Sequence, residues 1–261
     1  MRTSDFNAPD SEPAVDFPLR GLRVAGKFLE NAAGEKVRLD GVTYGPFPPS
    51  VGGRMYPERE RMEADLDQMV ELGLNAIRLY EPPPQDLLDA AWERGLGVMA
   101  GLAWTDHVDF LGEPDLVETA WELGVEQARA LRHPAVVAVV VGNEVEKTLV
   151  RWMGPLRVRR FLEEMIHRVR AELEPEVLVS YATYPSTEYL MPRNVDFFGV
   201  NLYLEEEAAL RSYLQRLQHR AGDRPLVVTE FGLDVARHGE AAQAEVARWW
   251  REALLDAGVA G

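Results

Sequence analysis

The sequence predicts an α/β fold, a (β/α)8 TIM barrel that begins with a β-hairpin. Seven short apolar runs alternate with helical patterns along the chain, and Ala135–Val141 is the clearest of these runs. Its residues are small or β-branched without polar alternation, which is typical of a strand buried on both faces. Strands that alternate with helices form a parallel sheet through right-handed crossovers, and 261 residues suit one barrel domain. A doubly wound open sheet is the alternative, although no Gly-x-Gly-x-x-Gly turn follows the first run.

Two segments of different character precede the expected barrel. Residues 1–18 are rich in Asp, Pro, Ser and Asn and lack periodicity, so we expect a disordered tail followed by one domain over residues 19–261. Leu22–Leu29 and Lys36–Leu39 flank the turn-rich hexamer Glu30–Glu35, which predicts a β-hairpin. We expect this hairpin to plug the N-terminal end of the barrel.

The expected barrel strands are short apolar runs, and the helices between them carry one apolar face. The strands cover Leu39–Tyr44, Ala76–Tyr80, Gly97–Ala103, Val136–Val141, Val177–Ala182, Phe197–Tyr203 and Leu226–Thr229. The helices repeat apolar residues at the i, i+3, i+4 and i+7 spacing of a buried face. They include residues 62–70, 87–92, 158–169, 210–217 and 246–254. Gly73, Gly95 and Gly124 fit helix ends or breaks.

The eighth strand is the element that the sequence does not complete. After the helix that ends near Asp256, only Gly258–Gly261 remains, and this segment can at most begin the strand. We therefore expect either a barrel whose eighth strand and helix are truncated or a chain that is part of a longer protein.

Composition limits the classes of partner. The formal net charge of -15 argues against nucleic acid and anionic membranes as partners, because both attract clustered Lys and Arg. The chain has no Cys, which excludes disulfides and thiolate metal sites. No apolar run approaches the roughly 20 residues that span a bilayer, and the N-terminus lacks the apolar stretch of a secretory signal. We expect a cytoplasmic protein or a soluble domain of a larger one.

Two glutamates stand at the ends of two apolar runs. Glu144 ends the fourth run and Glu230 the seventh, 86 residues later, which corresponds to three βα units. The carboxyl ends of barrel strands are where such folds place their chemistry. Two carboxyl groups about 5–5.5 Å apart can perform retaining glycoside hydrolysis, one as the acid and the other facing the anomeric carbon. Helix capping or a surface ion pair explains either glutamate alone equally well.

Four motifs lie in order on four expected strands. They are Ile77–Tyr80 on the second, Gly142–Glu144 on the fourth, Asn201–Tyr203 on the sixth and Thr229–Gly232 on the seventh. Together they resemble the retaining β-glycosidases with TIM barrels, known as the 4/7 superfamily or clan A. The resemblance covers about residues 22–261 and is closest to β-galactosidase-like and β-glucuronidase-like barrels, while Gly41–Gly45 adds a similarity to endo-β-1,3-glucanases. Similar domains are fused to, or encoded near, polysaccharide-synthesising glycosyltransferases, so the resemblance implies such a partner.

The resemblance implies a role for each matching residue. Glu144 would be the general acid/base, and Glu230 the nucleophile of a covalent glycosyl-enzyme intermediate. Arg78 and Tyr203 would hydrogen-bond to Glu230, and Asn143 would bind the sugar 2-hydroxyl. The orienting and substrate-binding residues would thus be Arg78, Asn143, Asn201 and Tyr203. A structural arginine and a half-buried aromatic are the competing interpretations of Arg78 and Tyr203.

Sugar sites also need flat apolar surfaces with polar groups at their edges. Trp104, after the third strand, is the best candidate for stacking on a pyranose, and Asp106 and His107 in the same loop are candidates for hydroxyl contacts. Tyr44 and Tyr181 occupy equivalent strand ends, and packing is the competing interpretation for each aromatic. Related enzymes carry an aromatic residue on the eighth strand, and this chain ends before that position. The remaining tryptophans with helical spacing are expected in the core: Trp92, Trp121, Trp249 and Trp250.

No pattern calls for a metal or an organic cofactor. The five histidines are not clustered at ligand spacing, and no phosphate-binding loop or serine elbow is present. A carbohydrate is the expected partner, and the acidic chain favours a neutral β-glucan over a uronic-acid polymer. Hydrolysis and transglycosylation stay open, because both pass through the same intermediate. A non-catalytic carbohydrate-binding or scaffold barrel is the alternative from another class.

Overall fold

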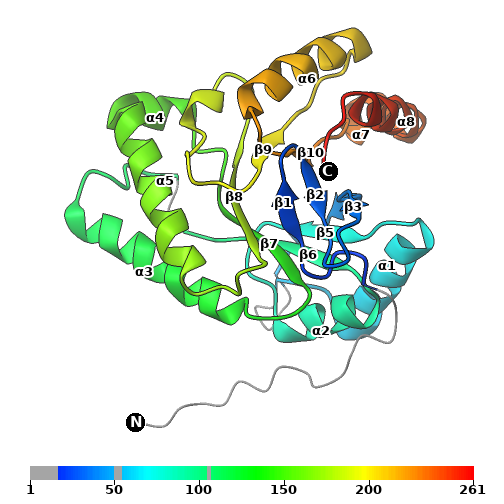
Figure 1. Ribbon diagram of the computed structural model, residues 1–261, viewed down its shortest axis with the longest axis horizontal. Helices are drawn as coiled ribbons and strands as arrows, with labels where there is room; N and C mark the ends of the chain where they lie inside the picture. The colour runs from blue at the N-terminus through cyan, green and yellow to red at the C-terminus, as the bar shows by residue number, and fades with distance from the viewer. Residues whose placement is uncertain (1–16, 50–54, 105–106) are drawn as a thin grey trace.

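The computed structural model describes residues 17–49, 55–104 and 107–261. Seven parallel strands form a nearly closed barrel that helices surround (Figure 1). The strands follow one another in chain order around the barrel, from β4 to β10. They are β4 (Gly41–Thr43), β5 (Ala76–Leu79), β6 (Gly97–Gly101), β7 (Val136–Asn143), β8 (Leu178–Thr183), β9 (Phe198–Asn201) and β10 (Leu226–Glu230). The predicted TIM-barrel architecture is confirmed.

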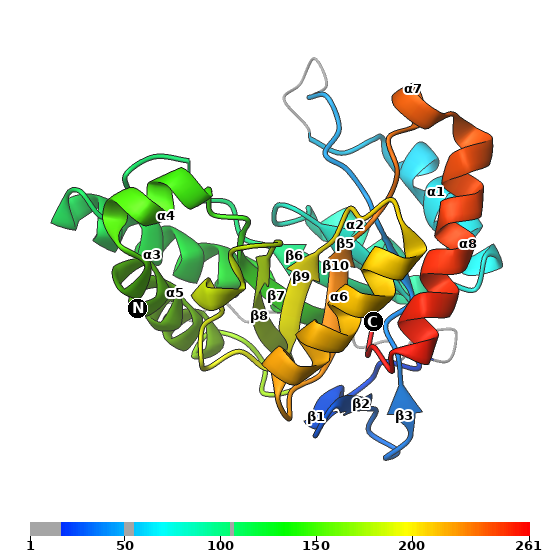
Figure 2. The ribbon, with the colours of Figure 1, turned by 90° about the horizontal axis from the view of Figure 1, so that it is seen from above.

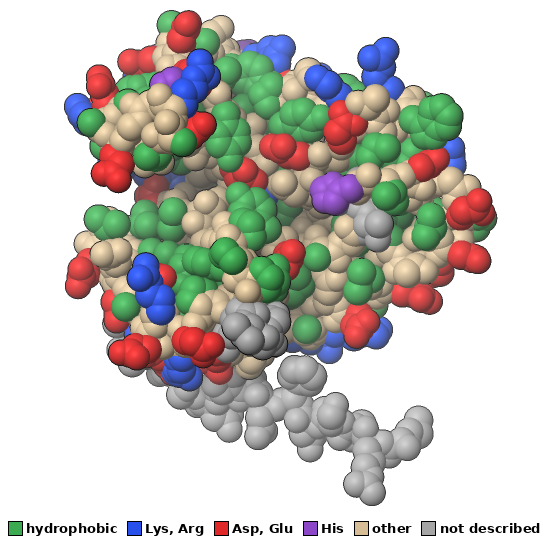
Figure 3. All heavy atoms as spheres, turned by 180° about the vertical axis from the view of Figure 1, so that it is seen from behind, with side chains coloured by type: hydrophobic (Ala, Val, Ile, Leu, Met, Phe, Trp, Pro, Cys, Tyr) green, Lys and Arg blue, Asp and Glu red, His purple; other side chains and the backbone are tan. Residues whose placement is uncertain are grey.

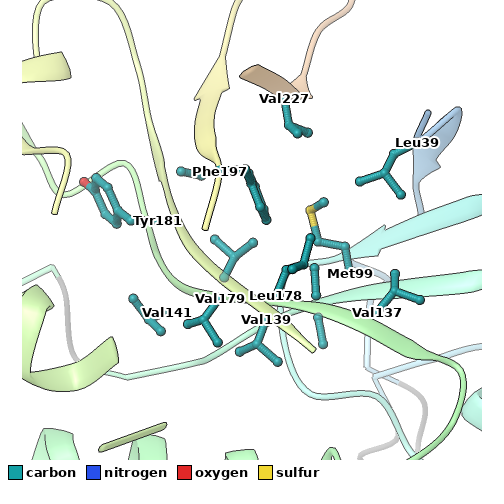
Figure 4. Packing of buried hydrophobic residues seen from close by; sticks show 14 of the residues in the cluster. Leu39, Met99, Val137, Val139, Val141, Leu178, Val179, Tyr181, Phe197 and Val227 are labelled. Carbon is teal, nitrogen blue, oxygen red and sulfur yellow. The ribbon is translucent and has the colours of Figure 1, made fainter. Parts of the chain in front are cut away.

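The central strand β7 shows why these segments form a barrel. All of its residues except Asn143 are buried, and it pairs in parallel with β6 and β8. Its β-branched side chains suit a pleated surface that is covered on both faces. Figure 4 shows valines of β7 in one core with side chains from other strands, among them Met99 and Leu178.

The helices alternate with the strands. They are α1 (Arg59–Glu71), α2 (Gln85–Glu93), α3 (Pro114–Ala130), α4 (Lys147–Met153), α5 (Pro155–Arg170), α6 (Glu207–Ala221), α7 (Val235–His238) and α8 (Glu240–Asp256), with the 3-10 helix η1 (Glu188–Leu190). The predicted apolar face of α5 is buried against the barrel over residues 158–169. Within the described ranges, no helix is both long and apolar enough to span a membrane.

Gly124 corrects one expectation about helix ends. It lies inside α3 and is buried, not at a break. A Cβ atom at this position would be 2.5 Å from Sδ of Met165 on α5. The glycine therefore permits close packing of α3 on α5 and does not end a helix.

The N-terminal segment forms three strands instead of the predicted two. β1 (Arg23–Ala25), β2 (Phe28–Glu30) and β3 (Lys36–Val37) make an antiparallel sheet in this order. A two-residue turn at Gly26 and Lys27, with a φ of 61° at Gly26, divides what the sequence suggested as one strand. Figure 2 shows this sheet at one end of the barrel, as expected for a plug.

The packed part of the chain begins earlier than residue 19. Phe17 is buried and its ring meets Trp92 edge-on at 5.0 Å. Leu19 is buried beneath the barrel, where a Cβ atom on Gly97 would lie 2.7 Å from its Cδ1. Residues 17 and 18 therefore do not belong to the predicted tail, and residues 1–16 lie outside the described part.

Between β10 and β4, the barrel is connected by the three residues Val259–Gly261. Leu39 N donates to Ala260 O at 3.0 Å, and on the other side Ala260 N donates to Leu226 O at 2.8 Å. Val228 N also donates to Gly261 O at 2.9 Å. Val259–Gly261 thus begins an eighth strand between β10 and the segment that enters β4, as the sequence suggested.

Candidate active site

The four strand motifs come together at the carboxyl ends of the barrel strands, opposite the three-stranded sheet (Figure 2). Arg78 lies on β5, Asn143 ends β7 with Glu144 directly after it, Asn201 ends β9, and Glu230 ends β10. Parallel strands present their carboxyl ends on one rim, so residues far apart in sequence meet there.

One amide nitrogen joins the two glutamates. Nδ2 of Asn201 donates to Oε1 of Glu144 at 2.8 Å and to Oε1 of Glu230 at 2.7 Å. These two oxygens therefore cannot be more than 5.5 Å apart. The oxygen of the Asn201 amide is held in turn by Thr229, whose hydroxyl donates to it at 2.6 Å. This hydrogen bond fixes the orientation of the Asn201 amide, so that its Nδ2 faces the two glutamates.

Arg78 brings a positive charge to the described part of the site. Its Nη1 lies 2.6 Å from Oε1 of Glu230, and both side chains are buried. The same nitrogen donates to the Thr229 carbonyl at 2.9 Å, and Nη2 donates to Oδ1 of Asn143 at 2.7 Å. A buried carboxylate is costly without a charged, hydrogen-bonded partner, and Arg78 provides one for Glu230.

Tyr203 and Asn143 complete the described contacts. The Tyr203 hydroxyl donates to the second oxygen of Glu230, Oε2, at 2.6 Å, and the ring is more than half exposed. Burial of the hydroxyl and its bond to Glu230 raise the pKa of Tyr203, which keeps it a donor. Oδ1 of Asn143 accepts from both Arg78 and Asn201, which turns the amide Nδ2 away from these donors.

Glu144 has an unusual backbone conformation and a shifted pKa. Its φ of 52° is in the left-handed region, which is uncommon for a residue other than glycine and clusters at functional sites. Burial raises the pKa of the Glu144 carboxyl above its ordinary value; the Asn201 hydrogen bond opposes the shift, and the charge of Glu230 adds to it. The surroundings of Glu144 therefore favour its protonated form more than water does.

Three predicted sugar-contact residues are buried and hydrogen-bonded within the protein in this structure. Trp104 is buried, its indole donates to the Val141 carbonyl at 2.6 Å, and its ring contacts Phe110 and Phe161. Tyr181 is fully buried and its hydroxyl accepts from Val145 N at 3.1 Å.

Tyr44 is the third of these residues. It is buried, and its hydroxyl donates to Asp65 of α1 at 3.0 Å. Trp104 and Tyr44 contact the surrounding helices through Phe161 of α5 and Asp65 of α1, whereas Tyr181 contacts the loop after β7. A sugar contact of these three residues stays a prediction. His107 is exposed in the loop after β6, while Asp106 lies outside the described residues.

Two residues of the site were not singled out from the sequence. Thr229 anchors the Asn201 amide, and Tyr80 lies under Arg78, whose guanidinium carbon is 5.0 Å from the ring centroid. Burial and the negative charge of Glu230 raise the pKa of Tyr80. Both belong to motifs that were recognised, but only the fold shows that the Thr229 side chain reaches the Asn201 amide and that Tyr80 lies close to Arg78 and Glu230.

No group of three or more metal-ligating side chains occurs in residues 17–49, 55–104 and 107–261. His133 is buried, accepts from Ala135 N through Nδ1 and faces Asp89 through Nε2. The described site is therefore built from carboxyl, amide, guanidinium and phenol groups.

The fold of the whole chain was compared with those of known proteins. No protein family matches the chain in sequence, and no curated protein does. A β-glucuronidase from Ruminococcus gnavus, solved with a C6-substituted uronic isofagomine, superimposes with a TM-score of 0.74 at 18% identity over 92% of this chain and 45% of that one. A Bacteroides uniformis β-glucuronidase gives a TM-score of 0.76 at 18% identity over 92% of this chain and 32% of that one. This chain spans less than half the length of these proteins, and it shares the barrel fold of solved β-glycosidases.

Proposed function

We propose that the chain is a retaining β-glycosidase in which Glu230 is the nucleophile and Glu144 the general acid/base. The observation that carries the proposal is the Asn201 amide, which binds both carboxyl groups and limits their nearest oxygens to 5.5 Å. Retaining enzymes hold their two carboxyl groups about 5–5.5 Å apart, whereas inverting enzymes leave room for a water between them.

The two steps follow from the contacts. Oε1 or Oε2 of Glu230 attacks the anomeric carbon while protonated Glu144 gives its proton to the glycosidic oxygen, so the C–O bond breaks and a glycosyl ester forms. Glu144, now a carboxylate, then removes a proton from water, which attacks the same carbon and releases Glu230. A sugar hydroxyl in place of that water gives transglycosylation.

The surrounding residues have supporting roles in this proposal. Arg78 and Tyr203 position Glu230, each from a different carboxyl oxygen, and the guanidinium of Arg78 also balances its charge. Asn143, with its oxygen held by Arg78 and Asn201, presents its N–H groups to the sugar 2-hydroxyl. No step calls for a metal or an organic cofactor.

The substrate we propose is a neutral, β-linked glucan-type glycan. A uronic substrate brings an additional carboxylate, and Arg78, the cation among the described residues of this site, is already bound to Glu230, Thr229 and Asn143. The net charge of -15 further disfavours an anionic polymer. An association with a polysaccharide-synthesising glycosyltransferase stays a prediction.

Covalent labelling tests the mechanism and the substrate class together. One structural neighbour, a Bacteroides uniformis β-glucuronidase, was solved covalently bound to cyclophellitol-6-carboxylate aziridine. We expect the neutral cyclophellitol aziridine to label this protein on Glu230, as located by peptide mass spectrometry, and to label it faster than the 6-carboxylate form. Glu230→Gln should take no label.

The outcomes separate the alternatives. Faster labelling by the 6-carboxylate form would overturn the neutral substrate but not the mechanism. Absence of labelling by both reagents, together with unchanged binding of a β-glucan to Glu230→Gln, would favour the non-catalytic carbohydrate-binding barrel.

A further inference from the structure

Two tyrosines that reach the surface follow β8 at the rim that carries the carboxyl ends of the barrel strands. Tyr184 comes directly after β8 and is half-buried, and Tyr189 lies in η1 and is 39% exposed. Figure 3 shows this face of the molecule, where hydrophobic side chains, a class that includes tyrosine there, lie beside acidic ones near the centre. Neither tyrosine takes part in the two proposed chemical steps.

Tyr184 is a direct neighbour of the segment that carries Glu144. Glu144 N donates to Ala182 O at 3.0 Å, and Lys147 N donates to the Tyr184 hydroxyl at 3.0 Å. Burial raises the pKa of Tyr184; the bond from Lys147 opposes the shift, and the negative charges of Glu146 and Glu144 add to it. The phenol therefore lies on the β8 side of the proposed acid.

A tight turn holds the backbone of Tyr184 in place. Thr187 is fully buried, and both its hydroxyl and its amide donate to Tyr184 O, at 2.8 and 3.0 Å. Tyr184 N donates back to the Thr187 hydroxyl at 3.3 Å. Within the turn, Ser186 has a φ of 75°, a left-handed conformation that persists in a residue other than glycine only where the surroundings impose it. The ring of Tyr184 thus projects from a fixed backbone.

Tyr189 is presented by an equally well anchored element. Glu188 is buried and accepts from Nη2 of Arg216 on α6 at 2.7 Å, and Leu190 is buried on the other side. Tyr189 lies between these two anchored residues and is exposed. Its charge is also among the causes that raise the pKa of Tyr184, so the two phenols lie close enough to interact.

The proposed chemistry determines which part of a substrate lies near these rings. The nucleophile faces the anomeric carbon and the acid reaches the oxygen of the bond that breaks, so the leaving sugar lies beyond Glu144, away from Glu230. Glu144 follows β7, whose neighbours in the barrel are β6 and β8. Among the described aromatic residues at the ends of these two neighbours, Trp104 after β6 is buried, whereas Tyr184 and Tyr189 after β8 reach the surface.

We propose that Tyr184 and Tyr189 form a subsite for the leaving sugar of a β-linked glycan, the first sugar beyond the cleaved bond. A tyrosine ring offers a flat apolar surface to the C–H face of a pyranose, with a polar group at its edge. The Tyr184 oxygen accepts from Lys147 N, and its own hydrogen can donate to a sugar hydroxyl. The inference rests on the proposed glycosidase function and adds that a sugar acceptor competes with water at this subsite.

Reactivation of a trapped glycosyl-enzyme tests the subsite. We expect 2,4-dinitrophenyl 2-deoxy-2-fluoro-β-glucoside to transfer its glycosyl group to Glu230 with loss of dinitrophenolate. Water, or a hydroxyl of added cellobiose or laminaribiose, then attacks the anomeric carbon, gives its proton to Glu144 and releases Glu230. Only the disaccharide uses the subsite. The quantity measured, by mass spectrometry of the intact protein, is therefore the ratio of the disaccharide-dependent to the water-dependent rate.

The variants separate ring contact from other effects. We expect Tyr184→Ala and Tyr189→Ala each to lower the ratio by about tenfold, because each removes a stacking surface. Tyr184→Phe keeps the ring and should retain more of the ratio than Tyr184→Ala. Phe28→Ala removes a 43% exposed aromatic side chain from the small sheet at the opposite end of the barrel and should leave the ratio unchanged.

Two results of this experiment would overturn the proposal. One is an unchanged ratio in both Tyr184→Ala and Tyr189→Ala. The other is an equal loss in Tyr184→Phe and Tyr184→Ala, which would show that the phenol acts through its bond to the Lys147 backbone and not through its ring.

An NMR titration with the same disaccharides separates the subsite from the activity. We expect either disaccharide to shift the ring resonances of Tyr184 and Tyr189 and to leave those of Phe28 in place. If Glu230 takes no label, the proposed glycosidase function fails, and the titration decides the sugar subsite by itself. Shifts at both tyrosine rings would uphold it, and their absence would overturn it.

Discussion

At the scale of single residues, Asn201 connects the two glutamates and acts on the pKa of Glu144. Its Nδ2 donates to both carboxyl groups. Among the causes that act on Glu144, burial raises the pKa and the Asn201 hydrogen bond lowers it. Asn201 therefore moderates how strongly Glu144 holds its proton.

Replacement of Asn201 should change the pH profile in a defined direction. In Asn201→Ala the contribution that lowers the pKa of Glu144 is lost, so the acid form persists to higher pH and the alkaline limb of kcat/KM for an aryl β-glucoside moves upward. We also expect kcat to fall by about 10- to 100-fold, since one oriented contact to the reacting groups is removed. Tyr203→Phe is the matched control: it loses a bond to Glu230 alone and should leave the alkaline limb in place. An alkaline limb that moves downward in Asn201→Ala would contradict this account.

At the scale of elements, the path of each barrel strand could be predicted and the direction of its terminal side chain could not. Continuous apolar runs such as Val136–Val141 have one favourable environment, between the barrel interior and the helices, and all seven were located from the sequence. The side chain of a residue that ends a strand can lie in any of several environments. Glu144 turns into the site through a left-handed backbone, whereas Trp104 and Tyr181 turn into the core. The direction of each of these side chains depends on neighbouring residues from other strands.

Close approach of β5 and β6 makes Gly101 a sensitive position. A Cβ atom on Gly101 would lie 2.3 Å from the Tyr80 carbonyl oxygen, a backbone atom that cannot rotate away. We expect Gly101→Ala to lower the free energy of unfolding by about 1–3 kcal/mol, as overpacking does, measured by urea denaturation. Gly124→Ala is the control, because there the nearest atom, 2.5 Å away, is Sδ of Met165 on a flexible side chain. The explanation fails if Gly101→Ala is no less stable than Gly124→Ala.

At the scale of the whole molecule, closure of the ring depends on Val259–Gly261. The remaining barrel strands pair with a neighbour on each side, whereas β4 and β10 are connected only through this segment.

Deletion of Val259–Gly261 removes the hydrogen bonds to Leu39, Leu226 and Val228. At about 1 kcal/mol per backbone hydrogen bond, we expect the free energy of unfolding to fall by about 3 kcal/mol. Hydrogen exchange should rise at the amides of Leu39 and Val228, which lie at opposite edges of the gap. Val259→Ala keeps the backbone bonds and should leave those two amides protected even if its smaller side chain costs stability. If the deletion leaves both amides protected, the ring is closed by the packing of α8 and not by these backbone hydrogen bonds.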